Sequence, residues 1–156
     1  MESQRLNNWL AVLTNLTVIA GVFFLAYEIH QNTIQLRSQA SYNLLQNRTL
    51  NAQLFLSNDE LLYSWMRARS GEALTEADNA RMVILARKAI LNWHWEWGQY
   101  VDGNLSHDEL PVRAFRRTFH SGYGPNINPF PDAWEVLSKS VQPEFVDWME
   151  ANVINN

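Results

Sequence analysis

The chain contains no cysteine and only six glycines in 156 residues. The absence of cysteine excludes disulfide bonds, thiolate nucleophiles and thiolate metal sites. The few glycines form neither the G-x-G-x-x-G pattern nor a P-loop, and a G-x-S-x-G nucleophile motif is also missing. The sequence therefore predicts no catalytic centre and no cofactor site, and we expect a protein without an enzymatic activity of its own.

Histidine is scarce as well, and its spacing disfavours a metal site. The four histidines are isolated along the chain: His30, His94, His107 and His120. No H-x-x-x-H or E-x-x-H pair places two ligands on one helical face. His94 and Glu96 are two positions apart, so on a helix their side chains point about 200° away from each other. We expect no bound metal.

Positive charge does not predominate, because 12 Lys and Arg oppose 16 Asp and Glu to give a formal net charge of −4. Without a basic stripe, nucleic acid is not an expected partner. A content of 47% hydrophobic and 18% charged residues argues against both a disordered chain and a polytopic membrane protein. What the chain has in excess is tryptophan, with seven residues, and tryptophan is favoured at membrane interfaces and protein contacts.

One stretch near the N-terminus, WLAVLTNLTVIAGVFFLAY from Trp9 to Tyr27, carries no charge. As a helix it spans about 28 Å, close to the thickness of the hydrocarbon layer of a bilayer. The segment before it is only weakly basic, the apolar run is longer than a signal-peptide core, and no small-x-small cleavage site follows. We therefore predict a single-pass membrane anchor within residues 1–30. The alternative is a long buried helix of a water-soluble protein.

Residues 31–156 are predicted to form one helical soluble domain, because no period-two alternation typical of strands occurs. The stretch 32–57 lacks Gly and Pro and continues the anchor as a helix. Its polar face is Gln, Asn and Ser, which suits a helix lying against another chain or emerging through lipid headgroups. Further helices are predicted at about 59–70, 75–101, 106–120, 132–140 and 143–153.

Capping residues mark several of these helix ends. Asn58 or Asp59 begins the second helix, and Gly71 ends it. Thr75 with Asp78 resembles a capping box that opens the long third helix.

A second capping box, S-x-x-E, is formed by Ser106 and Glu109, and it predicts the start of the fourth helix. Pro111 would then lie inside this helix and kink it. The Gly- and Pro-rich segment 121–131 is predicted to be a loop.

Short motifs over most of the chain resemble an uncharacterised group of bacterial single-pass membrane proteins. These motifs are EIHQNT at 28–33, N-D-E-L at 58–61, W-E-W-G-Q-Y at 95–100, G-N-L-S-H-D-E-L at 103–110 and P-E-F-V-D-W at 143–148. The resemblance implies an anchor followed by a short helical soluble domain, and it implies no activity. Pro111 and the Gly-Tyr-Gly-Pro loop depart from the pattern of the group.

Small and polar residues recur along one side of the predicted anchor at alternating spacings of three and four: Thr14, Thr17, Gly21, Phe24 and Glu28. Thr17 and Gly21 form a small-x-x-x-small pair that lets another helix approach, and Asn15 in lipid needs a hydrogen-bonding partner. The same register continues through Gln31, Gln35, Ser38, Tyr42 and Leu45. We predict a helix–helix interface here, and the alternative is chance combined with hydroxyls that bond back to their own helix.

The aromatic segment 93–100 is the second candidate site. Helical geometry places Trp93, Trp97 and Tyr100 on one broad face, with Glu96 at its edge and Trp95 on the opposite side. This face is either the centre of the core or a pocket for a cation or a flat ligand. Trp95 is a candidate contact with a partner subunit. Glu96 is expected to pair with one of five arginines: Arg81, Arg87, Arg113, Arg116 and Arg117.

These features predict an all-α protein in which one N-terminal transmembrane helix continues into a small helical bundle. We expect an accessory or scaffold subunit that self-associates or packs on a larger membrane complex, with membrane lipid as a further partner. Arg37 and Arg48 favour an inner-membrane protein whose soluble domain lies in the cytoplasm. The alternatives are a small-ligand sensor with its pocket at the aromatic segment and an enzyme with an acid at Glu96.

Overall fold

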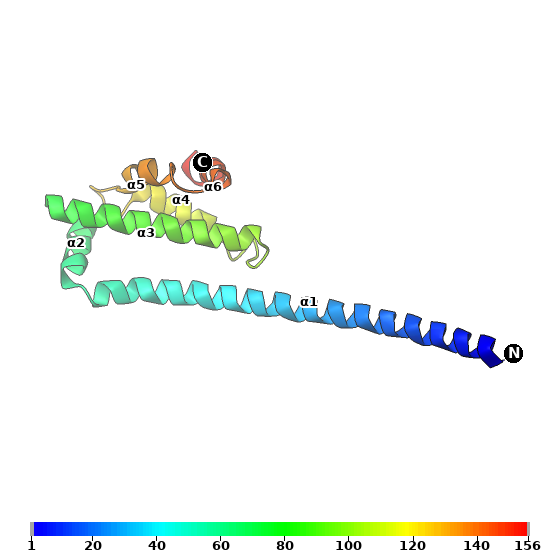
Figure 1. The fold of residues 1–156 in the computed structure, drawn as a ribbon. Coiled ribbons are helices and arrows are strands. Elements are labelled where there is room, and N and C mark those ends of the chain that lie inside the picture. Colours follow the sequence, from blue (N-terminus) through cyan, green and yellow to red (C-terminus); the bar gives the residue numbers. More distant parts are fainter. Residues whose placement is uncertain (1, 156) are drawn as a thin grey trace. The chain divides into compact units, whose positions relative to one another are not determined.

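The computed structural model describes residues 2–155 and is built from helices (Figure 1). The α-helices are α1 (Glu2–Leu56), α2 (Asp59–Ser70), α3 (Glu76–Val101), α4 (Val112–Ser121), α5 (Phe130–Leu137) and α6 (Pro143–Met149). A π-helical turn, η1 (Glu150–Ile154), follows α6. The only β-type pairing within residues 2–155 is a single bridge between Gly124 and Ile127. The all-α prediction is confirmed.

The chain divides into two compact units, one up to Gln39 and one from Ala40. The first consists of α1 residues alone. The second contains the last turns of α1 and every later helix. Residues 31–39, which we assigned to the soluble domain from the sequence, belong to the first unit in the structure.

Helix α3 is the centre of the second unit: α5 lies against it, and side chains of α4 and α6 contact its tryptophans (Figure 1). Its face with Ala86, Ile90, Trp93 and Trp97 packs against aromatic and aliphatic side chains of the three shorter helices and η1. The contributors include Phe115, Phe119, Phe130, Phe145, Met149 and Val153. Each helix of this unit thus buries one apolar stripe against α3 or a neighbour.

A smaller second cluster joins α2 to the N-terminal half of α3. It contains Leu61 and Ala68 of α2 with Met82 and Leu85 of α3. Leu54 and Phe55, from the last turn of α1, pack against the same cluster together with Trp65 of α2. The end of α1 is therefore held to the bundle by apolar contacts.

The predicted caps of α2 and α3 are confirmed. The side chain of Asn58 accepts a hydrogen bond from the Leu61 N–H at 2.9 Å, and Gly71 ends α2 with a φ of 77°. At the start of α3, Thr75 and Asp78 form both hydrogen bonds of a capping box. Each cap satisfies backbone groups that a helix end otherwise leaves without partners.

The prediction for α4 is wrong at its N-terminus. Glu109 does accept a hydrogen bond from the Ser106 N–H at 2.7 Å, but residues 103–110 form turns and the helix begins only at Val112. Pro111 is the N-cap residue and produces no kink. The physical reason is that proline disfavours helical backbone in the residue before it, so Leu110 stays outside the helix. Leu110 is instead buried in the core.

The C-terminal helices differ from their predicted bounds. We expected a helix at about 132–140, but α5 begins at Phe130 and ends at Leu137. Pro131 fits in the first turn, where its missing N–H has no intrahelical partner to lose, and Asn128 accepts a hydrogen bond from the Phe130 N–H at 3.2 Å. The last predicted helix is divided into α6 and the π-helical turn η1.

The loop between α4 and α5 docks on the C-terminal end of α2. The side chain of Asn126 donates a hydrogen bond to the Gly71 carbonyl at 2.8 Å. Gly124 lies so close to α2 that an added Cβ would overlap the carbonyl oxygen of Ala68. The loop therefore requires glycine at 124 because of close backbone approach.

Replacing Gly124 by alanine is expected to lower the free energy of unfolding by roughly 3 kcal/mol, because the loop has to withdraw from α2. Gly98 is the matched control, since it lies inside α3 and an added Cβ meets nothing within 4 Å. Gly98→Ala should stabilise the helix by about 0.5–1 kcal/mol. Chemical denaturation followed by circular dichroism measures the free energy of unfolding of both variants. Equal changes in this free energy for the two substitutions would show that the loop does not pack on α2.

Candidate functional site

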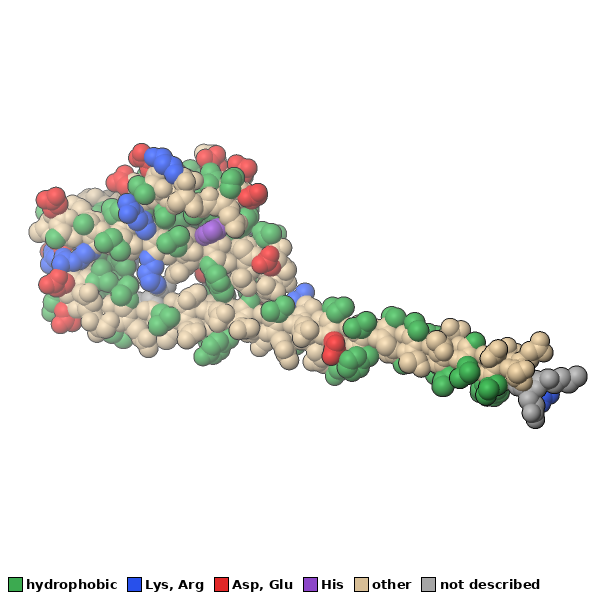
Figure 2. Space-filling model, viewed as in Figure 1, with side chains coloured by type: hydrophobic (Ala, Val, Ile, Leu, Met, Phe, Trp, Pro, Cys, Tyr) green, Lys and Arg blue, Asp and Glu red, His purple; other side chains and the backbone are tan. Residues whose placement is uncertain are grey.

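The N-terminal part of α1 exposes its apolar side chains. Within the described residues, α1 is the one helix long and apolar enough to cross a membrane by length and composition. Its most apolar window of 18 residues has a mean hydropathy of 2.1, and none of it is buried. Trp9 and Phe23, for example, are 74% and 72% exposed. On the face shown in Figure 2, hydrophobic side chains follow this helix, while charged side chains gather on the second unit.

The predicted helix–helix seam lies on this exposed helix. Thr14 and Thr17 donate their hydroxyl hydrogens to the carbonyls of Leu10 and Leu13, at 2.8 and 2.9 Å. These two hydroxyls are thus satisfied within the helix, as the alternative interpretation of the seam expected. They create no demand for a second helix.

The remaining residues of the predicted helix–helix interface are open. Asn15, Phe24 and Glu28 are exposed, and a Cβ added at Gly21 meets nothing within 4 Å. Among residues 2–155, no side-chain hydrogen bond engages Asn15. An amide can donate two and accept two hydrogen bonds. Asn15 therefore has a polar side chain without a partner on a face more than 100° from Thr17 and Gly21, while Gly21 leaves space for a close approach.

The last four turns of α1 have two different faces. Ala40, Leu44, Leu54 and Phe55 are buried or half-buried on one of them. The opposite face is exposed and forms a shallow groove of about 300 Å³, lined by Tyr42, Leu45, Gln46, Thr49, Leu50 and Gln53. Tyr42 and Leu45, which continue the register of the seam, thus lie on the open side.

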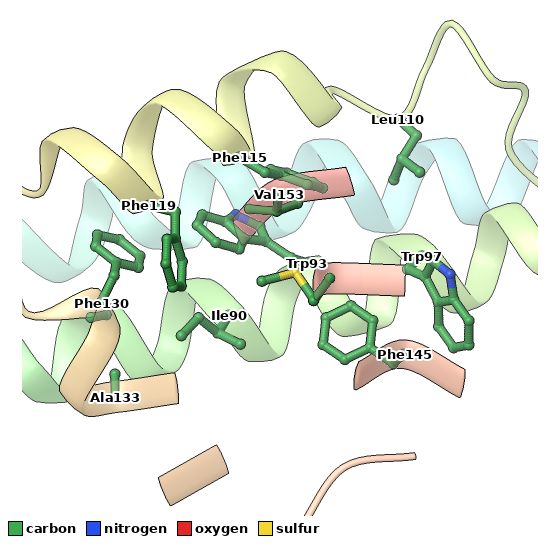
Figure 3. Close-up of a cluster of buried hydrophobic side chains, with 12 residues drawn as sticks. Ile90, Trp93, Trp97, Leu110, Phe115, Phe119, Phe130, Ala133, Phe145 and Val153 are labelled. Carbon is green, nitrogen blue, oxygen red and sulfur yellow. The ribbon is translucent and has the colours of Figure 1, made fainter. Parts of the chain in front are cut away.

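The aromatic segment of α3 lies in the core (Figure 3). The Trp93 ring stacks on Phe115 and Phe130, with centroids 4.8 and 5.4 Å apart, and Trp97 contacts Phe145 at 5.4 Å. Trp93 and Trp97 are both only 7% exposed. An aromatic cage for a cation needs open ring faces. This packing favours the core interpretation over a pocket at these residues.

The other residues of that segment lie nearer the surface. Tyr100 and Trp95 are half-buried, and Tyr100 meets His107 edge-on with centroids 6.2 Å apart. Glu96 is 8% exposed. Two of the arginines considered as its partners are engaged elsewhere: Arg81 pairs with Glu60 and Asp78, and Arg116 donates to the Asn152 carbonyl.

His94 lies beside this core and is not part of a metal cluster. Its ring is 4.6 Å from that of Phe145, and burial lowers its pKa, which a hydrogen bond with Gln142 partly offsets. Among the described residues, no group of three or more His, Cys, Asp or Glu side chains is placed to hold a metal ion.

The structure reveals one polar cluster that the sequence showed only in part. The Asp78 carboxylate is fully buried and accepts hydrogen bonds from Ser64 at 2.5 Å, Arg67 at 2.6 and 3.2 Å, and the Thr75 hydroxyl at 2.8 Å. Arg81 lies 3.4 Å from the same carboxylate. Thr75 and Asp78 were recognisable as a capping box. Ser64 and Arg67 were not, because only the fold brings α2 to α3.

Electrostatics in this cluster favour the charged form of Asp78. The hydrogen bond from Arg67, followed by that from Ser64, holds the pKa of Asp78 well below its usual range. The same pair raises the pKa of Arg67. A buried charge with this many donors is stable where it lies, and its arrangement ties α2 to α3. It offers no open position for a substrate.

Comparison of the chain with protein-family models, with curated proteins and with solved structures finds no match. The resemblance to bacterial single-pass membrane proteins therefore stays a prediction from the motifs.

Because folding lowers the pKa of Asp78, the folded state binds fewer protons than the unfolded chain in acid. The charged Asp78 carboxylate therefore stabilises the folded state fully above its unfolded pKa of about 4, and this stabilisation is lost as the pH falls below that value. Asp78→Asn should lower Tm at pH 7, and the difference in Tm between this variant and the wild-type protein should become smaller as the pH is lowered. Thermal melts across this pH range measure the difference in Tm, and Asp108→Asn, at a fully exposed aspartate, is the control. A difference in Tm that does not change with pH would contradict the stabilising role of the charged Asp78 carboxylate.

Proposed function

We propose that this chain is a membrane-anchored helical accessory or scaffold subunit, without catalysis of its own. The observation that supports it is the uncharged stretch from Trp9 to Tyr27, which is helical and exposed along its whole length. Each large apolar side chain left in water costs roughly 1.5–3 kcal/mol relative to burial. A bilayer removes this cost, and a helix satisfies all of its backbone hydrogen bonds within itself, as lipid requires.

The dimensions of the stretch support a single crossing. Its rise of about 28 Å corresponds to the hydrocarbon layer, and Trp9 and Tyr27 at its ends match the aromatic belts of membrane interfaces. Thr14 and Thr17 suit the lipid environment because their hydroxyls are bonded to the helix backbone. Arg37 and Arg48 favour the cytoplasmic side for the helical unit, and hence an inner-membrane location.

Association is the second part of the proposal. An asparagine in lipid is costly unless another helix supplies hydrogen-bonding partners, and Asn15 lies in the middle part of the apolar stretch. Gly21 allows such a helix to approach closely. Within the second unit, the end of α1 also has an exposed groove, which begins at Tyr42. We therefore propose that α1 packs against a second copy or against a helix of a larger membrane complex.

Membrane insertion is tested by replacing Ile19, near the middle of the stretch, with arginine. An arginine at this depth costs about 2.5–3.5 kcal/mol by insertion measurements, so the carbonate-resistant fraction of the protein should fall. Ile19→Leu is the matched control and should stay in the membrane pellet. Recovery of the wild-type chain as a water-soluble monomer would contradict the proposal.

Association is tested by Gly21→Leu and Asn15→Leu, with Leu16→Ile as a control, because helical geometry places Leu16 about 100° or more away from both positions. Both test substitutions should shift the chain towards smaller assemblies in mild detergent, because one blocks the close approach and the other removes the amide. Mass measurement of the detergent-extracted protein gives the assembly state, and circular dichroism should show an intact second unit. An unchanged assembly in both variants would exclude these two positions of α1 from the contact.

A further inference from the structure

The exposed face at the end of α1 has the spacing of a surface that receives a second helix. In a coiled coil, each side chain at the contact inserts into a hole formed by four residues of the facing helix. Neighbours at spacings of three, four and seven positions form such a hole, because they lie together on one helical face. The groove of about 300 Å³ contains two overlapping sets with this spacing. The first set is Tyr42, Leu45, Gln46 and Thr49, and the second is Gln46, Thr49, Leu50 and Gln53.

The helices of the second unit leave this face free. Ala40 is buried and marks the covered side of α1, and helical geometry places Tyr42 and Thr49 about 160–180° away from it. Tyr42, Leu45 and Leu56 are 64%, 65% and 80% exposed. A second helix can therefore lie along residues 42–56 without displacing α2 or α3.

The lining of the groove is uncharged, and its polar groups suit a contact between two identical surfaces. None of the six lining residues carries a charge. The Thr49 hydroxyl donates to the Leu45 carbonyl at 3.0 Å, which leaves the Thr49 methyl group for packing. The amides of Gln46 and Gln53 contain both donors and acceptors, so the same residues of two copies can pair. Two copies thus meet here without repulsion between like charges, and the groove offers no charge that would select an acidic or a basic partner.

The same stretch also carries apolar side chains that can fill such holes. Leu45 and Leu50 line the groove and are themselves exposed, and leucine is a common residue at the contact positions of coiled coils. A surface that carries both the holes and the side chains that fit them is self-complementary, as the contact between identical subunits requires.

We propose that this groove is the contact between two copies of the chain, whose α1 helices lie parallel to each other. The inference rests on the proposed membrane anchor, because two chains inserted in the same direction present their grooves to each other at a raised local concentration. It selects a second copy, rather than a helix of a different protein, as the partner of α1. Equivalent residues face each other in a parallel pair, so Thr49 lies opposite its equivalent in the second copy.

The absence of cysteine makes this contact testable by disulfide formation. In the purified full chain, reconstituted into liposomes, Thr49→Cys can form a disulfide only with another copy. With copper phenanthroline as oxidant, the linked dimer should form about tenfold or more faster than with Ser140→Cys, because paired grooves hold the two thiols at a raised effective concentration. Ser140 is exposed and lies outside the groove. Equal rates for the two variants would overturn the proposal.

A charge placed in the groove gives a second measurement. Leu45→Glu, added to Thr49→Cys, brings two carboxylates together across the contact and should slow dimer formation about tenfold. Val136→Glu in the same background makes a similar change at an exposed apolar residue of α5 and should leave the rate unchanged. Equal rates with the two glutamates would overturn the proposal. Circular dichroism checks the fold, and if Leu45→Glu does not fold, the comparison of Thr49→Cys with Ser140→Cys decides alone.

Flotation of the liposomes separates this test from the test of the membrane anchor. Protein that floats with the liposomes but shows no faster disulfide at Thr49→Cys keeps the anchor and overturns the contact between copies. Protein that does not float contradicts the anchor itself, and the parallel pair with it.

Discussion

The uncharged segment of α1 needs a surrounding medium other than water, and the proposed membrane anchoring and association both depend on this requirement. The segment satisfies its own backbone hydrogen bonds, but the described part of the chain gives its side chains no apolar surface to pack against. Lipid supplies such a surface for Leu, Val, Ile and Phe without any specific geometry. It does not supply a partner for Asn15, and this single amide makes a neighbouring helix part of the proposal.

The second unit is stabilised in the ordinary way of a small helical bundle, and its polar cluster adds specificity. Apolar stripes on α3 are covered on one side by α4, α5 and α6 and on another by α2. At the junction of α2 and α3, the buried carboxylate of Asp78 holds Ser64 and Arg67 in place. Removing one member of such a group leaves the others buried without partners, which is more costly than never having buried them.

Local signals predicted the helices well. Asn58 and Gly71 bound α2, and Thr75 with Asp78 opens α3, because capping uses residues within one turn of one another. The fourth helix was predicted too early for an equally local reason. The Ser106 and Glu109 pair forms one of its hydrogen bonds without a helix behind it, since the proline that follows sets the true start.

Features made by residues far apart in the sequence were not predictable in this way. The pairing of Ser64 with Asp78 joins positions fourteen residues apart on different helices. A cavity beside Trp65 requires the end of α1, two further helices and Tyr123 from a distant loop. The sequence did place Trp93 and Trp97 on one face, but whether that face was core or pocket depended on Phe115, Phe130 and Phe145.

The environment of α1 is the central claim, and the absence of cysteine makes it directly measurable. Single cysteines placed one at a time between Leu10 and Ala26 can each carry a nitroxide spin label, in protein reconstituted into liposomes. If the segment lies in the bilayer, the labels collide readily with dissolved oxygen and poorly with a water-soluble nickel complex, and this difference is largest near the middle of the stretch. Free access of the nickel complex along the whole segment would contradict this membrane location.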